Sequence, residues 1–135
     1  MDEVIMIKEG TVSLWLGNVD TEENFDTMVE TDYNEDGDFV PSKFDNLYQI
    51  DYYNESTKEV HFANESVDSL EKLLEGFSYD ETIIPQFAKF DFKKVFTDYN
   101  SIVLLYDFEH TQEVKIVSEQ GFYFEFIGFV PYDLD

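Results

Sequence analysis

The sequence predicts an α+β fold, in which an antiparallel β-sheet carries helices packed mainly on one face and ends in a C-terminal strand meander. Three observations lead to this prediction. Residues 11–17 alternate with the period of two that a strand requires, the first two thirds of the chain contain stretches with helical spacing, and strand-like runs separated by turns follow residue 101. The chain has 135 residues, the size of one domain, and we take residues 1–135 as a single domain.

The strand around which we expect the chain to be organised is Thr11–Gly17. Val12, Leu14 and Leu16 share one face of this strand, and Trp15 lies on the other, less apolar face. Trp15 is the only tryptophan, and its position allows two interpretations. Either a second layer covers this face and Trp15 belongs to the core, or its indole lies at a docking surface; the core interpretation is favoured because aromatic side chains are mostly buried.

Two helices are expected next. Asp20 can cap the first helix, with Glu23 three residues later reaching back as in a capping box. The buried stripe of this helix is Phe25, Met28 and Val29. The second helix opens at residues 41–42, where proline and serine suit a helix start, and its apolar residues are Phe44, Leu47 and Tyr48.

The middle of the chain has one strand and one clear helix. Residues 59–63 have strand character. Ser66 is predicted to cap a helix that ends at Gly76 and has the apolar face Val67, Leu70, Leu73 and Leu74. For residues 77–99 we expect two short helical turns and a connection, because Pro85 interrupts the pattern.

The C-terminal third is predicted to be all strand. Residues 102–106 are apolar on both sides, as in a central strand that is covered on two faces. We expect 107–112 to form a hairpin loop, 114–117 a strand, 119–121 a turn and 122–130 the last strand.

The charge is the most unusual property of the chain. Asp and Glu number 31 against 8 basic residues, all of them Lys, so the formal charge is −23. Such a field repels nucleic-acid phosphates and anionic membranes, and it favours a protein partner with a basic surface. The chain has no cysteine, and its start does not resemble a signal peptide; we therefore expect a soluble, cytoplasmic protein that binds neither nucleic acid directly nor a membrane.

Residues 32–43 partly match a calcium-binding loop. Asp32, Asn34 and Asp36 place oxygens at the first, third and fifth positions, and Gly37 occupies the sixth. The twelfth position, which should carry glutamate, is Lys43. We therefore predict a tight acidic turn and no metal or other cofactor, and calorimetric titration with calcium separates the two interpretations.

Catalytic motifs are missing from the sequence. His61 and His110 are the only histidines, and neither has a neighbour that would give it a catalytic or metal-binding role. The sequence contains no glycine-rich phosphate loop, no nucleophile elbow and no arginine. These observations predict a protein that is not an enzyme.

Several segments together resemble the immunity protein 22 family of bacterial polymorphic-toxin systems. They are Thr11–Gly17 with the acidic stretch after it, Asp32–Phe39 leading into Pro41, Ser101–Phe108, and Phe124–Phe129. The resemblance implies an α+β domain with a characteristic tryptophan, which we match to Trp15. It also implies a protein that is encoded beside a toxin, frequently a nuclease, and that protects the producing cell by binding this toxin. The family assigns no catalytic residues.

A partner-binding surface follows from the charge pattern. No basic residue occurs between Lys8 and Lys43, so this stretch is the most negative part of the molecule. The predicted contact residues are Glu30, Asp32, Tyr33, Glu35, Asp36 and Asp38, with Tyr52 and Tyr53 as aromatic anchors. The alternative is that these acids form only a solvated face.

A second function is compatible with the same composition. An acidic DNA mimic that inhibits a DNA-binding protein would also be compact and negative. The gene neighbourhood separates the two functions, because a toxin gene beside this gene favours immunity and a phage operon favours mimicry.

Overall fold

A computed structural model describes residues 6–65, 67–92, 94–111 and 113–132. It confirms the α+β fold. In the described residues, a five-stranded antiparallel sheet has the order β4-β5-β1-β7-β6, and β2 and β3 form a small sheet of their own. The strands are β1 (Ile7–Val19), β2 (Asp32–Tyr33), β3 (Phe39–Val40), β4 (Lys58–Phe62), β5 (Ser101–Phe108), β6 (Ile116–Glu119) and β7 (Phe122–Pro131). The helices are α1 (Glu22–Val29), α2 (Lys43–Leu47), α3 (Leu70–Leu74) and α4 (Asp80–Phe87), with 3-10 turns at Glu55–Thr57 and Phe96–Asp98.

Strand β1 is the centre of the sheet, as predicted. It pairs with β5 on one side and with β7 on the other. Trp15 is 0 % exposed, so the core interpretation of this residue is correct. The polar residues of the same face do not reach solvent either: Ser13 is buried, and its hydroxyl donates a hydrogen bond to the carbonyl of Phe108 at 2.8 Å. A small polar residue whose hydrogen bond is satisfied can therefore occupy a covered face.

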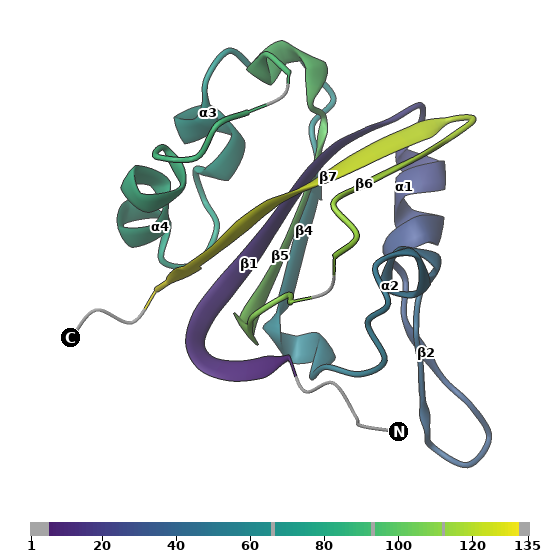
Figure 1. The fold of residues 1–135 in the computed structure, drawn as a ribbon. Helices are drawn as coiled ribbons and strands as arrows, with labels where there is room; N and C mark the ends of the chain where they lie inside the picture. Colours follow the sequence, from purple (N-terminus) through teal and green to yellow (C-terminus); the bar gives the residue numbers. More distant parts are fainter. Residues whose placement is uncertain (1–5, 66, 93, 112, 133–135) are drawn as a thin grey trace.

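The helices lie on both faces of the sheet, which corrects the prediction that they pack mainly on one face. Helices α1 and α2 cover the face that carries Trp15, while α3 and α4 cover the face that carries Leu14 and Leu16 (Figure 1). Two separate hydrophobic cores result. The reason is that β1 and β5 are buried on both sides, and two buried faces require two covering layers.

The C-terminal strands do not form a meander, so this part of the prediction is wrong. Strand β5 lies between β4 and β1, whereas within the described ranges β6 pairs with β7 alone, at the opposite edge of the sheet. Of the predicted hairpin loop 107–112, the first two residues belong to β5, and the residues after Phe108 lead to β6 at the other edge of the sheet rather than to a neighbouring strand; Gln112 lies outside the described residues. Asp107 adopts a positive φ of 58°, and its carboxylate accepts a hydrogen bond from the amide of Gly10 at 2.9 Å.

Two helix starts differ from the prediction. Thr21, not Asp20, caps α1, and its side chain accepts a hydrogen bond from the amide of Asn24. Ser69 caps α3, which is shorter than predicted; Ser66 lies outside the described residues. Helix α2 begins after Ser42 as expected, and a reciprocal capping box with Asp45 holds it.

Helix α4 was predicted only as short turns. It continues through Pro85 because Ile83 and Phe87 bury their side chains against the sheet, and this packing offsets the missing backbone hydrogen bond. In the described part of the chain, no helix is long and apolar enough to cross a membrane.

Candidate functional site

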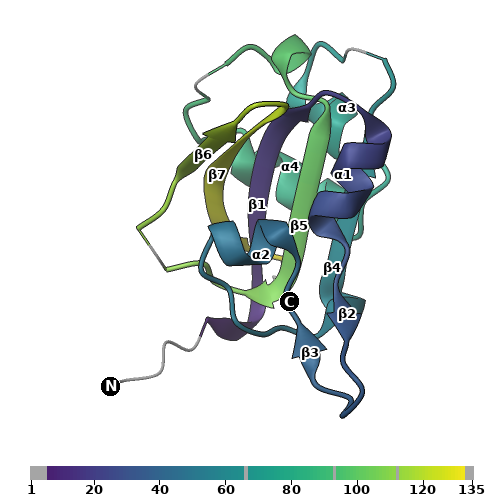
Figure 2. The same ribbon diagram turned by 90° about the vertical axis from the view of Figure 1, so that its right-hand side faces the viewer.

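The acidic segment folds as a hairpin that projects beyond the end of the main sheet (Figures 1 and 2). Strands β2 and β3 pair antiparallel, with Asp32 opposite Val40 and Tyr33 opposite Phe39. The hairpin follows α1 and leads into α2, and both helices pack against the Trp15 face. The core of the protein therefore anchors both ends of the hairpin.

The turn of the hairpin is organised by Asn34. Its side-chain Oδ1 accepts hydrogen bonds from the amides of Asp36 (2.9 Å) and Asp38 (3.0 Å). Gly37 supplies the positive φ, 82°, that the turn requires. The oxygen that a calcium loop would use at its third position thus already binds backbone amides. This geometry is that of the predicted tight acidic turn.

The predicted acidic contact residues all lie at the surface of the hairpin or next to it. The carboxylates of Glu30, Asp32, Glu35, Asp36 and Asp38 belong to exposed residues. We call these five residues, together with Tyr33, Phe39 and Tyr52, the hairpin surface.

A row of aromatic rings crosses the base of the hairpin. The ring of Phe39 lies between Tyr33 and Tyr52, with centroid distances of 6.1 Å and 5.3 Å. Tyr33 is 48 % exposed and Tyr52 is 57 % exposed. Phe39 was missed by sequence reasoning, although the alternation that places it opposite Tyr33 in a hairpin was a usable signal.

Tyr53 is not an exposed anchor, which corrects its predicted role. The residue is only 2 % exposed and packs beneath the hairpin, 5.2 Å from Phe39. Its hydroxyl donates to Oδ2 of Asp45 at 3.2 Å. Tyr52 and Tyr53 are neighbours in an extended segment and therefore point to opposite sides, so only one of them can reach solvent.

A buried polar group below the hairpin holds the aromatic row in place. Asp45 is 1 % exposed, and burial raises the pKa of its carboxyl group, whereas the hydrogen bonds from Ser42 and Tyr53 and the charge of Lys58 act in the opposite direction. Lys58 donates to the carbonyl of Val29 at 2.6 Å and lies 5.7 Å from the ring of Tyr53. The ammonium group of Lys58 is thus held at the base of the hairpin, where the charges of Asp45, Glu55 and Glu30 act on it.

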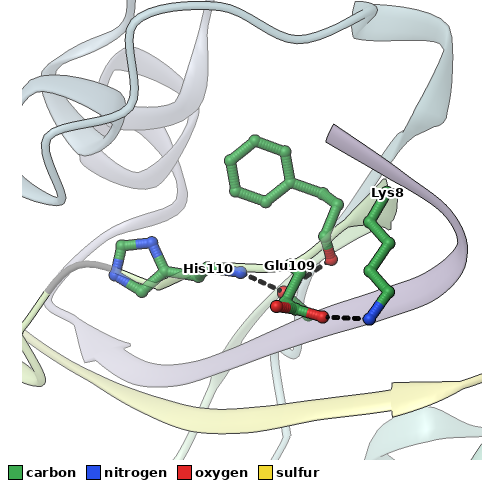
Figure 3. A network of polar contacts seen from close by, with 5 residues as sticks. Lys8, Glu109 and His110 are labelled. Carbon is green, nitrogen blue, oxygen red and sulfur yellow. Dashed lines mark hydrogen bonds and ion pairs between the residues drawn. The ribbon is translucent and has the colours of Figure 1, made fainter. Parts of the chain in front are cut away.

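The two histidines lie in different environments. His61 is an exposed residue of β4. His110 is 2 % exposed, and its ring packs against Trp15 at 5.3 Å and Phe126 at 4.7 Å. Figure 3 shows that this ring points away from the Lys8–Glu109 ion pair, which is 2.7 Å long. The backbone amide of His110, rather than its ring, takes part in the local polar network by donating to Ser13 Oγ at 3.1 Å.

The buried position of His110 predicts a loss of stability in mild acid. Burial lowers the pKa of His110 to about 4, whereas in the unfolded chain the ring binds a proton below about pH 6.5. Above pH 6.5 the ring is neutral in both the folded and the unfolded state. As the pH falls from 6.5 towards 4, the unfolded chain binds a proton that the folded protein does not bind, so the free energy of unfolding decreases. Between pH 7 and 4.5 we expect the free energy of unfolding of the wild type to fall by about 2–3 kcal/mol more than that of His110→Leu, as measured by urea unfolding.

The control for this experiment is His61→Leu, because His61 is exposed. We expect the pH dependence of this variant to follow that of the wild type. Parallel stability curves for the wild type and His110→Leu would show that the ring does not resist protonation in the folded state.

The site has the properties of a binding surface. Among the residues that the structure describes, no three His, Asp or Glu side chains are grouped so that they could hold a metal ion. The hollows between the described elements open to solvent, and exposed carboxylates gather on and beside a projecting hairpin. An exposed, charged hairpin of this kind is typical of a surface that contacts another macromolecule.

Comparison with known families identifies the family of the chain and, with it, the class of its partner. The family model for immunity protein 22 matches residues 12–133, and the chain therefore belongs to the immunity protein 22 family. This membership confirms the resemblance found in the sequence. Immunity proteins neutralise a cognate toxin by binding it and are not enzymes. Neither a search of curated proteins nor a search of solved structures found a match.

Proposed function

We propose that the chain neutralises a nuclease toxin in the cytoplasm of the producing cell, and that it binds the basic surface of this toxin through the hairpin surface. The observation that carries this proposal is the set of five exposed carboxylates around Tyr33 and Tyr52, on the projecting hairpin and next to it. Family membership supplies the toxin partner. The nuclease activity, the basic surface and the location of the contact are parts of the proposal.

The charge of the hairpin surface suits this task. A nuclease presents lysine and arginine side chains to phosphates, and a dense group of carboxylates is attracted to the same basic surface. Long-range attraction accelerates the encounter, and the bound protein then excludes the nucleic acid. The total charge of −23 strengthens the attraction from every direction, while the hairpin surface determines the orientation.

The aromatic row is expected to determine the lifetime of the complex. Tyrosine side chains bury a large area at a low entropic cost and are enriched among the residues that dominate binding. We expect Tyr52→Ala to raise the dissociation rate about tenfold and to leave the association rate nearly unchanged, as measured by surface plasmon resonance.

Tyr79→Ala is the matched control for Tyr52→Ala. Tyr79 is also 57 % exposed, but it caps α4, which lies on the opposite face of the sheet. We expect its dissociation rate to match that of the wild type. An equal effect of the two substitutions would contradict the assignment of the aromatic row.

Co-expression tests the function itself. The chain should restore growth to cells that express the toxin encoded beside its gene, and the two proteins should be purified as a complex. Growth arrest in the presence of the chain, with no complex recovered, would overturn the proposal. Family membership favours a toxin as partner over the DNA-binding protein that a DNA mimic would inhibit.

A further inference from the structure

The edge of the main sheet formed by β4 is open for pairing with another strand. In the described residues, β4 (Lys58–Phe62) is the last strand on its side of the sheet and pairs only with β5. It lies beside α1 and above the hairpin in Figure 2. An exposed strand edge presents backbone donors and acceptors that an extended segment can use.

The register shows which backbone groups point outward. The amide of Ala63 donates to the carbonyl of Asn100 at 2.7 Å, so the backbone groups of Ala63 point towards β5. The backbone groups of successive strand residues point alternately to opposite sides. Those of His61 therefore also point towards β5, and those of Val60 and Phe62 point away from the sheet. The outward amide of Lys58 is already bonded to the carbonyl of Glu55.

Two hollows flank this edge, one on each face of the sheet. The hollow on the α3 side has a volume of about 520 Å³, and it is lined by Leu73 and Phe77 together with the charged residues Lys58, Glu59, Lys72 and Glu75. The hollow on the α1 side has a volume of about 290 Å³ and is lined by Glu22 and Asp26 as well as Phe25. Val60 borders both hollows.

We propose that an extended segment of the toxin pairs with β4 as a sixth strand of the sheet. Its alternate side chains would enter the two hollows, as in peptide recognition by strand addition. The inference rests on the proposed function, which supplies the toxin as partner.

The charge of the edge determines the chemistry of this segment. Glu22 and Asp26 are exposed carboxylates at the α1 hollow, so the side chains that enter it are lysine or arginine. The lining of the α3 hollow carries charges of both signs, from Glu59 and Glu75 and from two lysines, so it does not select the charge of the side chain that enters it. A second copy of this chain does not fit, since its own charge of −23 would repel the same carboxylates.

Hydrogen exchange measured by NMR tests the pairing directly. The probe is the catalytically inactive toxin encoded beside this gene, added to the full chain. We expect the amide exchange of Val60 and Phe62 to slow about tenfold or more in the complex. At the other edge of the sheet, the amide of Phe126 donates to the carbonyl of Lys115, so Ser118 of β6 points outward, and its exchange should not change.

A proline substitution provides the second test. Val60→Pro removes one outward amide and leaves the pairing with β5 intact, a position at which an edge strand tolerates proline. We expect the toxin affinity to fall about tenfold or more, because one backbone hydrogen bond and the close approach of the added strand are lost. Ser118→Pro makes the same change at the opposite edge and should leave the affinity within about twofold.

The outcomes separate this inference from the proposed function. A complex in which Val60 and Phe62 exchange as fast as in the free chain overturns the added strand and leaves toxin binding in place. Slowed exchange at both amides, together with full affinity of a variant with reversed charges on the hairpin, supports the added strand and overturns the hairpin surface as the contact. If Val60→Pro does not fold, the exchange experiment on the wild type decides.

Discussion

Reversal of two hairpin charges, Asp36→Lys with Asp38→Lys, is expected to slow association with the toxin about tenfold or more at low salt. Both residues are exposed, and it is their backbone amides, not their carboxylates, that hold the turn by bonding to Asn34. The substitutions therefore remove attraction for a basic partner and leave the fold intact. Stopped-flow association measured at several salt concentrations checks this, and the difference from the wild type should shrink as salt is added.

The matched control changes the same total charge far from the hairpin. Glu81→Lys with Asp91→Lys replaces two exposed acids on the α4 side of the sheet. We expect only a small decrease in its association rate, because the charges are distant from the contact and screened by salt. If both double variants slow association equally, net charge rather than the hairpin surface controls the encounter. If neither does, the contact lies elsewhere.

Trp15→Ala is expected to destabilise the protein by about 3–5 kcal/mol, the usual cost of removing a large buried aromatic side chain. Trp15 is fully buried and packs against Phe44 at 5.4 Å, Tyr48 at 5.7 Å and Phe126 at 5.1 Å. Phe44 belongs to α2, Tyr48 caps the C-terminal end of α2, and Phe126 belongs to β7. The substitution therefore also loosens the support of the hairpin. Urea unfolding followed by circular dichroism measures the effect, and for a domain with a total stability of about 5–15 kcal/mol it is a large fraction.

Val95→Ala serves as the comparison for Trp15→Ala. Val95 is 65 % exposed, and its replacement should change the free energy of unfolding by no more than about 0.5 kcal/mol. A Trp15→Ala variant as stable as Val95→Ala would show that the indole does not organise the Trp15 face.

Much of the local structure was predictable because it depends on neighbouring residues. The alternation in Thr11–Gly17 identified β1, the stripe of Phe25 and Met28 identified α1, and the proline and serine before Lys43 identified α2. In each case the deciding interactions, such as caps, turns and the periodicity of apolar side chains, act within a few residues. The acidic surface was equally accessible, since charge is a property of composition and exposed positions tolerate it.

The predictions were wrong where the structure depends on contacts between residues that are far apart in the sequence. Strand β5 pairs with β4 and β1 rather than with β6, and no feature of residues 107–112 indicates that choice. Tyr52 and Tyr53 are the same residue type side by side, yet only Tyr53 is buried, because Asp45 and Phe39 approach it from other elements.

The sequence by itself determined that this chain has an acidic α+β fold built around the Trp15 strand, and that it belongs with the immunity proteins. The tertiary structure decided the strand order, the helices on both faces, the aromatic row of Tyr33, Phe39 and Tyr52, and the open edge of β4. The division follows from the range of the forces. Periodicity, capping and turns act along the chain, whereas burial and strand partners depend on contacts between residues far apart in sequence.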